Sequence, residues 1–194
     1  QSIKCALVEA QTLFNCGKEI EGKLAYRAAL SMLKDDAAIS VDDKFDVFAT
    51  KLQFEDEADA MAWGNKLLQQ AGNDRRLQAN YFRVLDAYLT KRPEERLALL
   101  KKRANELLER DEFDDAFDVL YKAVRLSAGD TDTQLAALRA AVNLYRQGSR
   151  TPELLDNINE LFKALEKLDA SDPRYPALEK LRLQWAEQSG SANP

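Results

Sequence analysis

The balance between helix-forming and β-branched residues constrains the fold of this chain more than any other feature. Alanine and leucine supply 57 of its 194 residues, whereas valine, isoleucine and threonine together supply only 17. Helices favour Ala and Leu, and strands favour β-branched side chains. The sequence therefore predicts an all-α protein. Its seven glycines and five prolines predict short turns between the helices.

Apolar periodicity and helix-end signals predict ten helices. Ser40 with Asp43 three residues later is a capping pattern, Gly72 suits a left-handed helix end, and Pro93 suits a first helical turn. The expected helices span residues 3–16, 18–34, 41–53, 56–71, 74–91, 94–110, 112–127, 131–147, 152–168 and 173–188. Because the connections are short, neighbouring helices are expected to pair antiparallel.

A small-residue pattern repeats along these helices. A small or apolar residue is followed four positions later by a small residue and, three further, by leucine. The four copies are Ala6/Ala10/Leu13, Ala60/Gly64/Leu67, Leu100/Ala104/Leu107 and Ala137/Ala141/Leu144. A small central residue lets the next helix approach closely, so we expect Ala104, Ala116, Ala123 and Ala141 to be buried at helix contacts. The helix over 41–53 has no evident partner in this pattern.

The segment 97–128 resembles the tetratricopeptide repeat family. Its Ala104, Leu107, Phe113, Ala116, Leu120 and Ala123 stand at the signature spacings of that family. Residues 3–34 match less well, and Lys34 and Ala128 replace the proline that ends the family's second helix. The resemblance implies a right-handed stack of antiparallel helix hairpins, a tetratricopeptide-like α-solenoid. We expect one such domain over 1–188 and a frayed tail over 189–194.

The resemblance also implies a concave groove lined by the first helix of each pair. The residues expected to project toward this groove are Asn65, Lys101, Lys102, Asn105, Arg139, Tyr145 and Arg146. In the family, a Lys and an Asn four residues apart can grip the terminal carboxylate of a peptide, and Lys101 and Asn105 have this spacing. Leu135 stands where the family has another lysine, so only a fragment of that clamp is present.

The composition argues against catalysis, metal binding and nucleic-acid binding. The chain has no histidine, only two cysteines, and no closely spaced glycines that could form a phosphate loop. Its net charge is −5, and acidic and basic residues are interspersed, whereas phosphate recognition needs clustered Lys and Arg. We therefore expect a non-enzymatic protein without cofactor or metal.

The cysteines and the first residue leave the compartment open. On one continuous helix, Cys5 and Cys16 lie roughly 16 Å apart, too far for a disulfide. They are expected to be two buried thiols, and a bent N-terminal arm with a disulfide is the alternative. The chain begins with Gln1, which indicates a processed or excised product, either secreted or periplasmic after signal cleavage or a cytoplasmic fragment. No apolar stretch approaches the ~20 residues of a membrane span.

Two functions are compatible with these features. The first is a protein–protein interaction scaffold that presents a concave peptide groove to another protein, either an acidic peptide or a partner helix. The alternative is an adaptor or assembly domain of a larger membrane-associated or secretion complex, which binds through its convex side or its terminal helices. The sequence gives neither the partner nor the oligomeric state.

Overall fold

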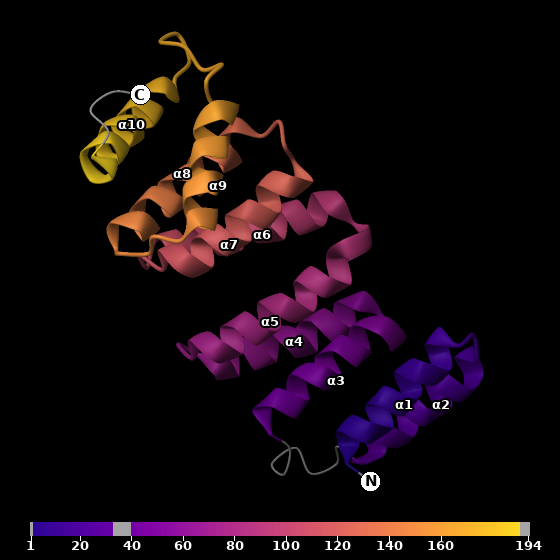
Figure 1. Cartoon of the computed structure of the whole chain (residues 1–194). Helices are drawn as coiled ribbons and strands as arrows, with labels where there is room; N and C mark the ends of the chain where they lie inside the picture. Colours follow the sequence, from indigo (N-terminus) through magenta and orange to yellow (C-terminus); the bar gives the residue numbers. More distant parts are fainter. Residues whose placement is uncertain (1, 33–39, 191–194) are drawn as a thin grey trace. The chain divides into compact units, whose positions relative to one another are not determined.

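The computed structural model describes residues 2–32 and 40–190, and this part of the chain contains ten α-helices and no strand. The all-α prediction and the predicted number of helices are therefore confirmed. The helices are α1 (Ile3–Asn15), α2 (Glu19–Ser31), α3 (Val41–Phe54), α4 (Glu57–Ala71), α5 (Arg75–Tyr88), α6 (Pro93–Leu108), α7 (Phe113–Leu126), α8 (Thr131–Arg146), α9 (Pro152–Ala164) and α10 (Tyr175–Ser189) (Figure 1).

The helix ends agree with the predicted signals with a few exceptions. Ser40 caps α3 through the backbone N–H of Asp43, and Gly72 ends α4 at a φ of 51°. Helix α9 ends at Ala164, four residues before the predicted end. Of the predicted frayed tail 189–194, Ser189 closes α10, and residues 191–194 lie outside the described part, as do residues 33–39.

The chain divides into two compact units, 1–91 and 92–194. The boundary falls between the short 3-10 turn Leu89–Lys91 and Pro93, which opens α6. The units are described separately below, and the single domain expected over 1–188 stays a prediction.

In the first unit, the hairpin of α1 and α2 is held together by small residues. Ala10 is fully buried, and a Cβ added to Gly22 would lie only 3.1 Å from the carbonyl oxygen of Ala10 and 3.0 Å from the amide nitrogen of Phe14. A larger side chain at either position would push the two backbones apart. The other side of α1 packs against α3 (Figure 1).

Besides α1, helix α3 has two further partners in the first unit, which corrects the expectation that it has no evident partner. It packs against both α4 and α5, and its Phe45, Val47 and Phe48 are buried. The repeat pattern pairs consecutive helices only, so it could not reveal a helix that inserts between two others.

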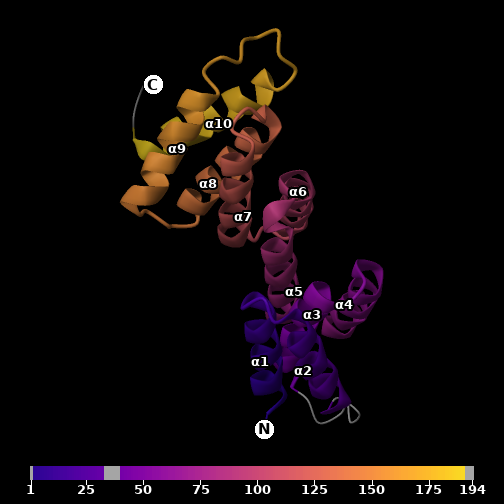
Figure 2. The same ribbon diagram turned by 90° about the vertical axis from the view of Figure 1, so that its right-hand side faces the viewer.

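In the second unit, α6, α7, α8 and α9 pack consecutively and α10 packs against α8 (Figures 1 and 2). The predicted burial of Ala104, Ala116, Ala123 and Ala141 is confirmed, because all four are fully buried. The small-residue pattern therefore marks the close helix contacts of this unit.

Replacing Ala104 by Leu is expected to lower the free energy of unfolding of the second unit by about 1–3 kcal/mol, because extra methylenes overpack a closed site. Each unit carries one of the two tryptophans, so Trp185 fluorescence in a Trp63→Phe background reports the second unit. Ala98→Leu, on the exposed face of the same helix, is the control and should change little. An equal effect of the two changes would contradict the assigned contact.

The expected burial of the two cysteines is wrong. Cys5 and Cys16 are both exposed, unpaired thiols. Helix α1 buries the face that carries Ala6, Leu7 and Ala10, and Cys16 stands beyond its last residue as the C-cap. The alternative, a disulfide through a bent arm, is not formed either, because α1 runs without interruption from Ile3 to Asn15.

Candidate functional site

The second unit carries a groove of about 580 Å³ between α6, α8 and α10, which we call the α6/α8/α10 groove. Its lining combines apolar side chains with amides and cations. The apolar lining residues are Leu108, Leu135, Ala136, Ala177 and Leu181, and the polar ones are Asn105, Asp132, Arg139, Asn143, Lys180 and Gln184. Three separate helices thus bring polar groups to one apolar depression.

Two cations of this groove have no counter-charge in the described part of the chain. Arg139 on α8 and Lys180 on α10 are exposed, and neither forms a salt bridge with a residue that the structure describes. Asp132, the one acid among the described lining residues, pairs with Arg174 at 3.4 Å. The groove therefore presents positive charge in a protein whose net charge is −5.

Arg174 fixes the loop that leads into α10. Besides Asp132, it donates hydrogen bonds to both carboxylate oxygens of Asp172, at 2.8 and 2.7 Å. These bonds hold the pKa of Asp172 at about 2, so its carboxylate stays charged at neutral pH. The Arg174 contacts thus connect the start of α10 to α8. Helix α10 is the side of the groove that supplies Lys180 and Gln184.

Of the seven residues predicted from the sequence, the structure brings Asn105 and Arg139 together in this groove. Lys102 and Arg146 are exposed outside its lining. Asn65 belongs to α4 in the first unit, where its Oδ1 accepts a hydrogen bond from the hydroxyl of Tyr81 at 2.7 Å.

Lys101 has a structural partner. Its ammonium group forms an ion pair with Asp130, which caps α8 by accepting a bond from the amide of Thr133 at 3.2 Å. Burial by itself would raise the pKa of Asp130, but the bonds from Lys101 and Thr133 outweigh it, and the pKa is lowered. Lys101 therefore ties α6 to the start of α8, which makes it a poor candidate for gripping a ligand.

Tyr145 lies in the core, although the sequence predicts it in the groove. It is only 7% exposed, and its ring packs edge-on against Trp185 of α10, with the ring centroids 4.8 Å apart. The guanidinium of Arg150 lies 4.7 Å from the same ring. Tyr145 follows the buried Ala141 by four residues, so the helical period itself places both on one face.

Sequence reasoning missed the contribution of α10. Ala177, Lys180, Leu181 and Gln184 recur at the three- and four-residue steps of one helix face, and all four line the groove. That spacing could have identified these four residues as one face of a helix. It could not have shown what the face covers, because α10 lies outside the repeated pattern.

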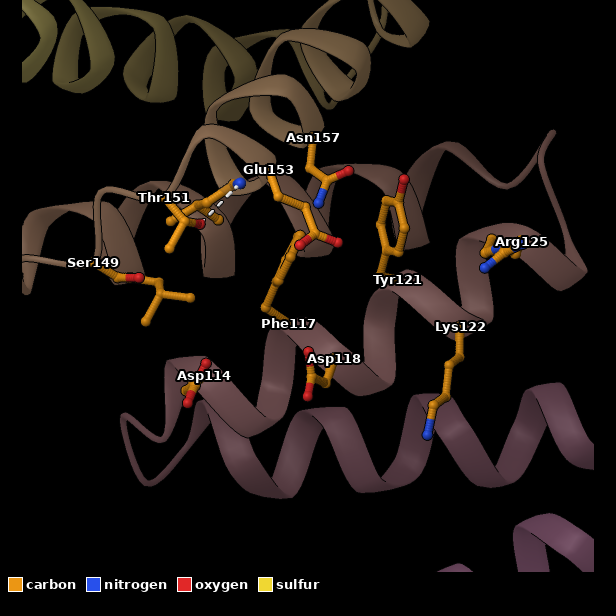
Figure 3. Close-up of a pocket in the computed structure, with 12 residues that line it drawn as sticks. Asp114, Phe117, Asp118, Tyr121, Lys122, Arg125, Ser149, Thr151, Glu153 and Asn157 are labelled. Atoms are coloured by element: carbon orange, nitrogen blue, oxygen red, sulfur yellow. Dashed lines mark hydrogen bonds between the residues drawn. The ribbon is translucent and has the colours of Figure 1, made fainter.

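A second groove of about 480 Å³ lies between α7 and α9, and we call it the α7/α9 groove (Figure 3). Asp114, Asp118 and Lys122 follow one another along α7, and Glu153 and Asn157 of α9 face them across the groove. Burial raises the pKa of Asp118, and the nearby Asp114 raises it further, while Lys122 opposes the shift.

Asp118→Asn is expected to stabilise the second unit modestly at neutral pH. A raised pKa means that the folded state holds the Asp118 proton more tightly than the unfolded chain does. The free energy of unfolding therefore falls as the pH rises above the pKa that Asp118 has in the unfolded chain. Because Asp118 is exposed, the gain should stay below about 1 kcal/mol at pH 7. It should vanish near pH 3, where the carboxyl is protonated in both states. Urea unfolding at both pH values measures it, and a pH-independent gain would contradict the electrostatic cause.

The described residues offer few signs of other chemistry. Among them, no three His, Cys, Asp or Glu side chains are grouped so as to hold a metal ion. None of the described helices is both long enough and apolar enough to cross a membrane. Comparison of the chain with protein-family models, curated proteins and solved structures finds no match, so its function must be argued from these residues themselves.

Proposed function

We propose that the second unit is a tetratricopeptide-like protein-binding module whose α6/α8/α10 groove binds an extended acidic segment of a partner protein. The observation that carries the proposal is the pair of cations, Arg139 and Lys180, which line an apolar groove and have no counter-charge among the described residues. An acidic ligand would supply those counter-charges.

The lining suits a peptide better than a small anion. Asn105, Asn143 and Gln184 provide amides that can both donate to and accept from a peptide backbone. The floor of Leu108, Leu135 and Leu181 can bury apolar side chains between the charged ones. Three packed helices form the walls before any ligand arrives, so most of the ordering cost falls on the ligand.

A non-enzymatic role follows from the groups that the groove lacks. The chain contains no histidine, and Asp132 in the described lining is already paired with Arg174. The remaining polar groups in that lining are three amides, one guanidinium group and one ammonium group. The groove can therefore recognise a ligand, but it offers no acid–base pair for chemistry.

Charge reversal in the groove should strongly weaken this binding. A fluorescein-labelled set of extended Asp- and Glu-rich peptides is titrated with the protein, and fluorescence anisotropy is measured. Arg139→Glu with Lys180→Glu should weaken binding at least about tenfold, because two charge-assisted contacts become repulsive. Added salt should weaken the binding of the native protein as well.

The matched control is Lys102→Glu with Arg146→Glu, which changes the net charge equally at exposed residues outside the groove lining. This control should bind the acidic peptides nearly as well as the native protein. Equal weakening by both double variants would mean that only the overall charge matters. Full binding by a folded groove variant would place the site elsewhere.

The α7/α9 groove supports a second candidate, an assembly domain of a larger complex that uses this other surface. Its described lining carries three acids without a described salt bridge, Asp114, Asp118 and Glu153, against two cations, Lys122 and Arg125. Because the acids are in excess, a basic segment of a partner is the complementary ligand. Asp114→Lys with Glu153→Lys should abolish capture of Lys-rich peptides and leave binding of the acidic peptides unchanged. The two grooves can thus be tested independently.

A further inference from the structure

Helices α8 and α10 run parallel along the α6/α8/α10 groove. At one end, Arg174, the residue before α10, pairs with Asp132 in the first turn of α8 at 3.4 Å. Toward the C-terminal ends of the two helices, the rings of Tyr145 and Trp185 pack with their centroids 4.8 Å apart. Because the starts of the helices meet and their later turns meet as well, the two helices run in the same direction (Figure 1).

Interpolation between these two contacts sets the groove residues of α8 and α10 at matching levels. Six residues of the lining form three levels, each with one member from either helix: Ala136 with Ala177, Arg139 with Lys180, and Asn143 with Gln184. The groove therefore changes along its length from an apolar level to a cationic level and then to an amide level.

The groove is longest along α8. Its described lining takes residues from about three turns of α8, between Asp132 and Asn143, but only Asn105 and Leu108 from α6. An extended peptide that follows α8 therefore meets the three levels in succession. Levels three or four helical residues apart are separated by about 4.5 to 6 Å. Alternate side chains of an extended peptide are about 6.6 Å apart and share one face, so successive levels meet every second residue of the peptide.

We infer that the groove recognises an apolar and an acidic side chain that are separated by one residue in the ligand, in either order. This inference rests on the function proposed above and names the ligand more narrowly. Arg139 and Lys180 stand at one level on two walls, so a single carboxylate between them can accept hydrogen bonds from both. Ala136 and Ala177 are the shortest side chains of the described lining, so their level has room for a bulky apolar side chain beside Leu135.

The amide level adds affinity without a demand on the ligand's side chains. The side-chain nitrogen of Asn143 donates to the backbone carbonyl of Arg139 at 2.8 Å, which holds this amide beside the cationic level. The amides of Asn143 and Gln184 can both donate to and accept from a peptide backbone, whatever side chain that residue carries. Selectivity among peptides therefore comes from the apolar and cationic levels.

Peptides of one composition test the spacing. Each carries a fluorescein label, one Phe and one Glu in a Gly–Ser background, and a C-terminal carboxamide. The Phe and Glu are adjacent, two positions apart or three positions apart, and the tighter of the two orders is taken at each separation. Anisotropy should show binding at least about tenfold tighter at a separation of two, because only this spacing sets both side chains on one face of an extended peptide.

Ala177→Leu tests the apolar level. The longer side chain fills the space that the Phe of the ligand would occupy, so the affinity ratio between separations of two and one should fall to near one. The matched control is Ala98→Leu, the same change on α6 outside the described lining, which should leave this ratio unchanged. Both alanines are exposed, so neither change should unfold the second unit.

The outcomes separate this inference from the proposed function. If neither these peptides nor the Asp- and Glu-rich peptides bind, the proposed function fails and the inference fails with it. If acidic peptides bind and Arg139→Glu with Lys180→Glu weakens them, but the separation of Phe and Glu has no effect, the inference alone is overturned. An unchanged affinity ratio in Ala177→Leu would also overturn it, because the apolar side chain would then bind at another level.

Discussion

Gly64→Ala should strongly destabilise the first unit, although alanine is the better helix former. Gly64 stands inside α4, where replacing Gly by Ala usually gains about 1 kcal/mol. Here a Cβ would lie 2.3 Å from Cε2 and 2.4 Å from Cζ of Phe48. Contacts this short require the ring or the helix to move.

The Phe48 ring has little room to move. It is fully buried, and it stacks on the ring of Tyr81 with an interplanar angle of 5° and centroids 5.4 Å apart. We expect overpacking to cost about 3 kcal/mol or more, which outweighs the gain in helix propensity and leaves a net loss of about 2 kcal/mol. Urea unfolding followed by Trp63 fluorescence in a Trp185→Phe background measures this loss.

A double-mutant cycle assigns the loss to this contact. Phe48→Leu removes the ring atoms that the new methyl group would meet, at a cost of its own. Adding Gly64→Ala to Phe48→Leu should then cost little more, or even stabilise the helix. If the two losses simply add, Gly64 is required for a reason other than the Phe48 ring.

The helices could be predicted because their signals are local. The capping serine Ser40, the positive φ of Gly72 and the first-turn prolines Pro93 and Pro152 act within a few residues of the chain. Burial of Ala104 and Ala141 followed from a small-residue spacing that one helix face imposes. Such features need no knowledge of distant parts of the structure.

The partner of Gly64 could not be predicted in this way. The repeat pattern identifies Gly64 as a close-contact position and assigns it to the next helix along the chain. The structure instead sets Phe48 of the preceding α3 against it. A small residue reveals that another group approaches closely, but the identity of that group depends on how α3 packs among α1, α4 and α5.

In the candidate groove, too, some residues could be predicted from local signals and others depend on tertiary contacts. Asn105 and Arg139 could be predicted because they flank the buried Ala104 and Ala141 on their own helices. Lys180 and Gln184 could not, because they come from α10, which follows a ten-residue connection and packs back onto α8. Two of the six polar residues in the described lining therefore depend on a tertiary contact without a local signature.

Tyr145→Ala is expected to be the most damaging single change in the second unit. If Tyr145 were a groove residue, its loss would weaken ligand binding and leave stability unchanged. The structure buries it between Trp185 and Arg150, so removing the ring leaves a cavity beneath α10. Loss of a buried aromatic ring typically costs about 3–5 kcal/mol.

Tyr145→Phe separates the two roles. It keeps the ring and removes only a long hydrogen bond, 3.4 Å from Arg150 to the hydroxyl, so we expect a loss below about 1 kcal/mol. In Tyr145→Ala, Trp185 loses its ring partner, and its emission should shift to longer wavelength. Binding of acidic peptides should fall in this variant because α10 carries Lys180 and Gln184, and should persist in Tyr145→Phe. Unchanged stability of Tyr145→Ala would contradict the core position of this ring.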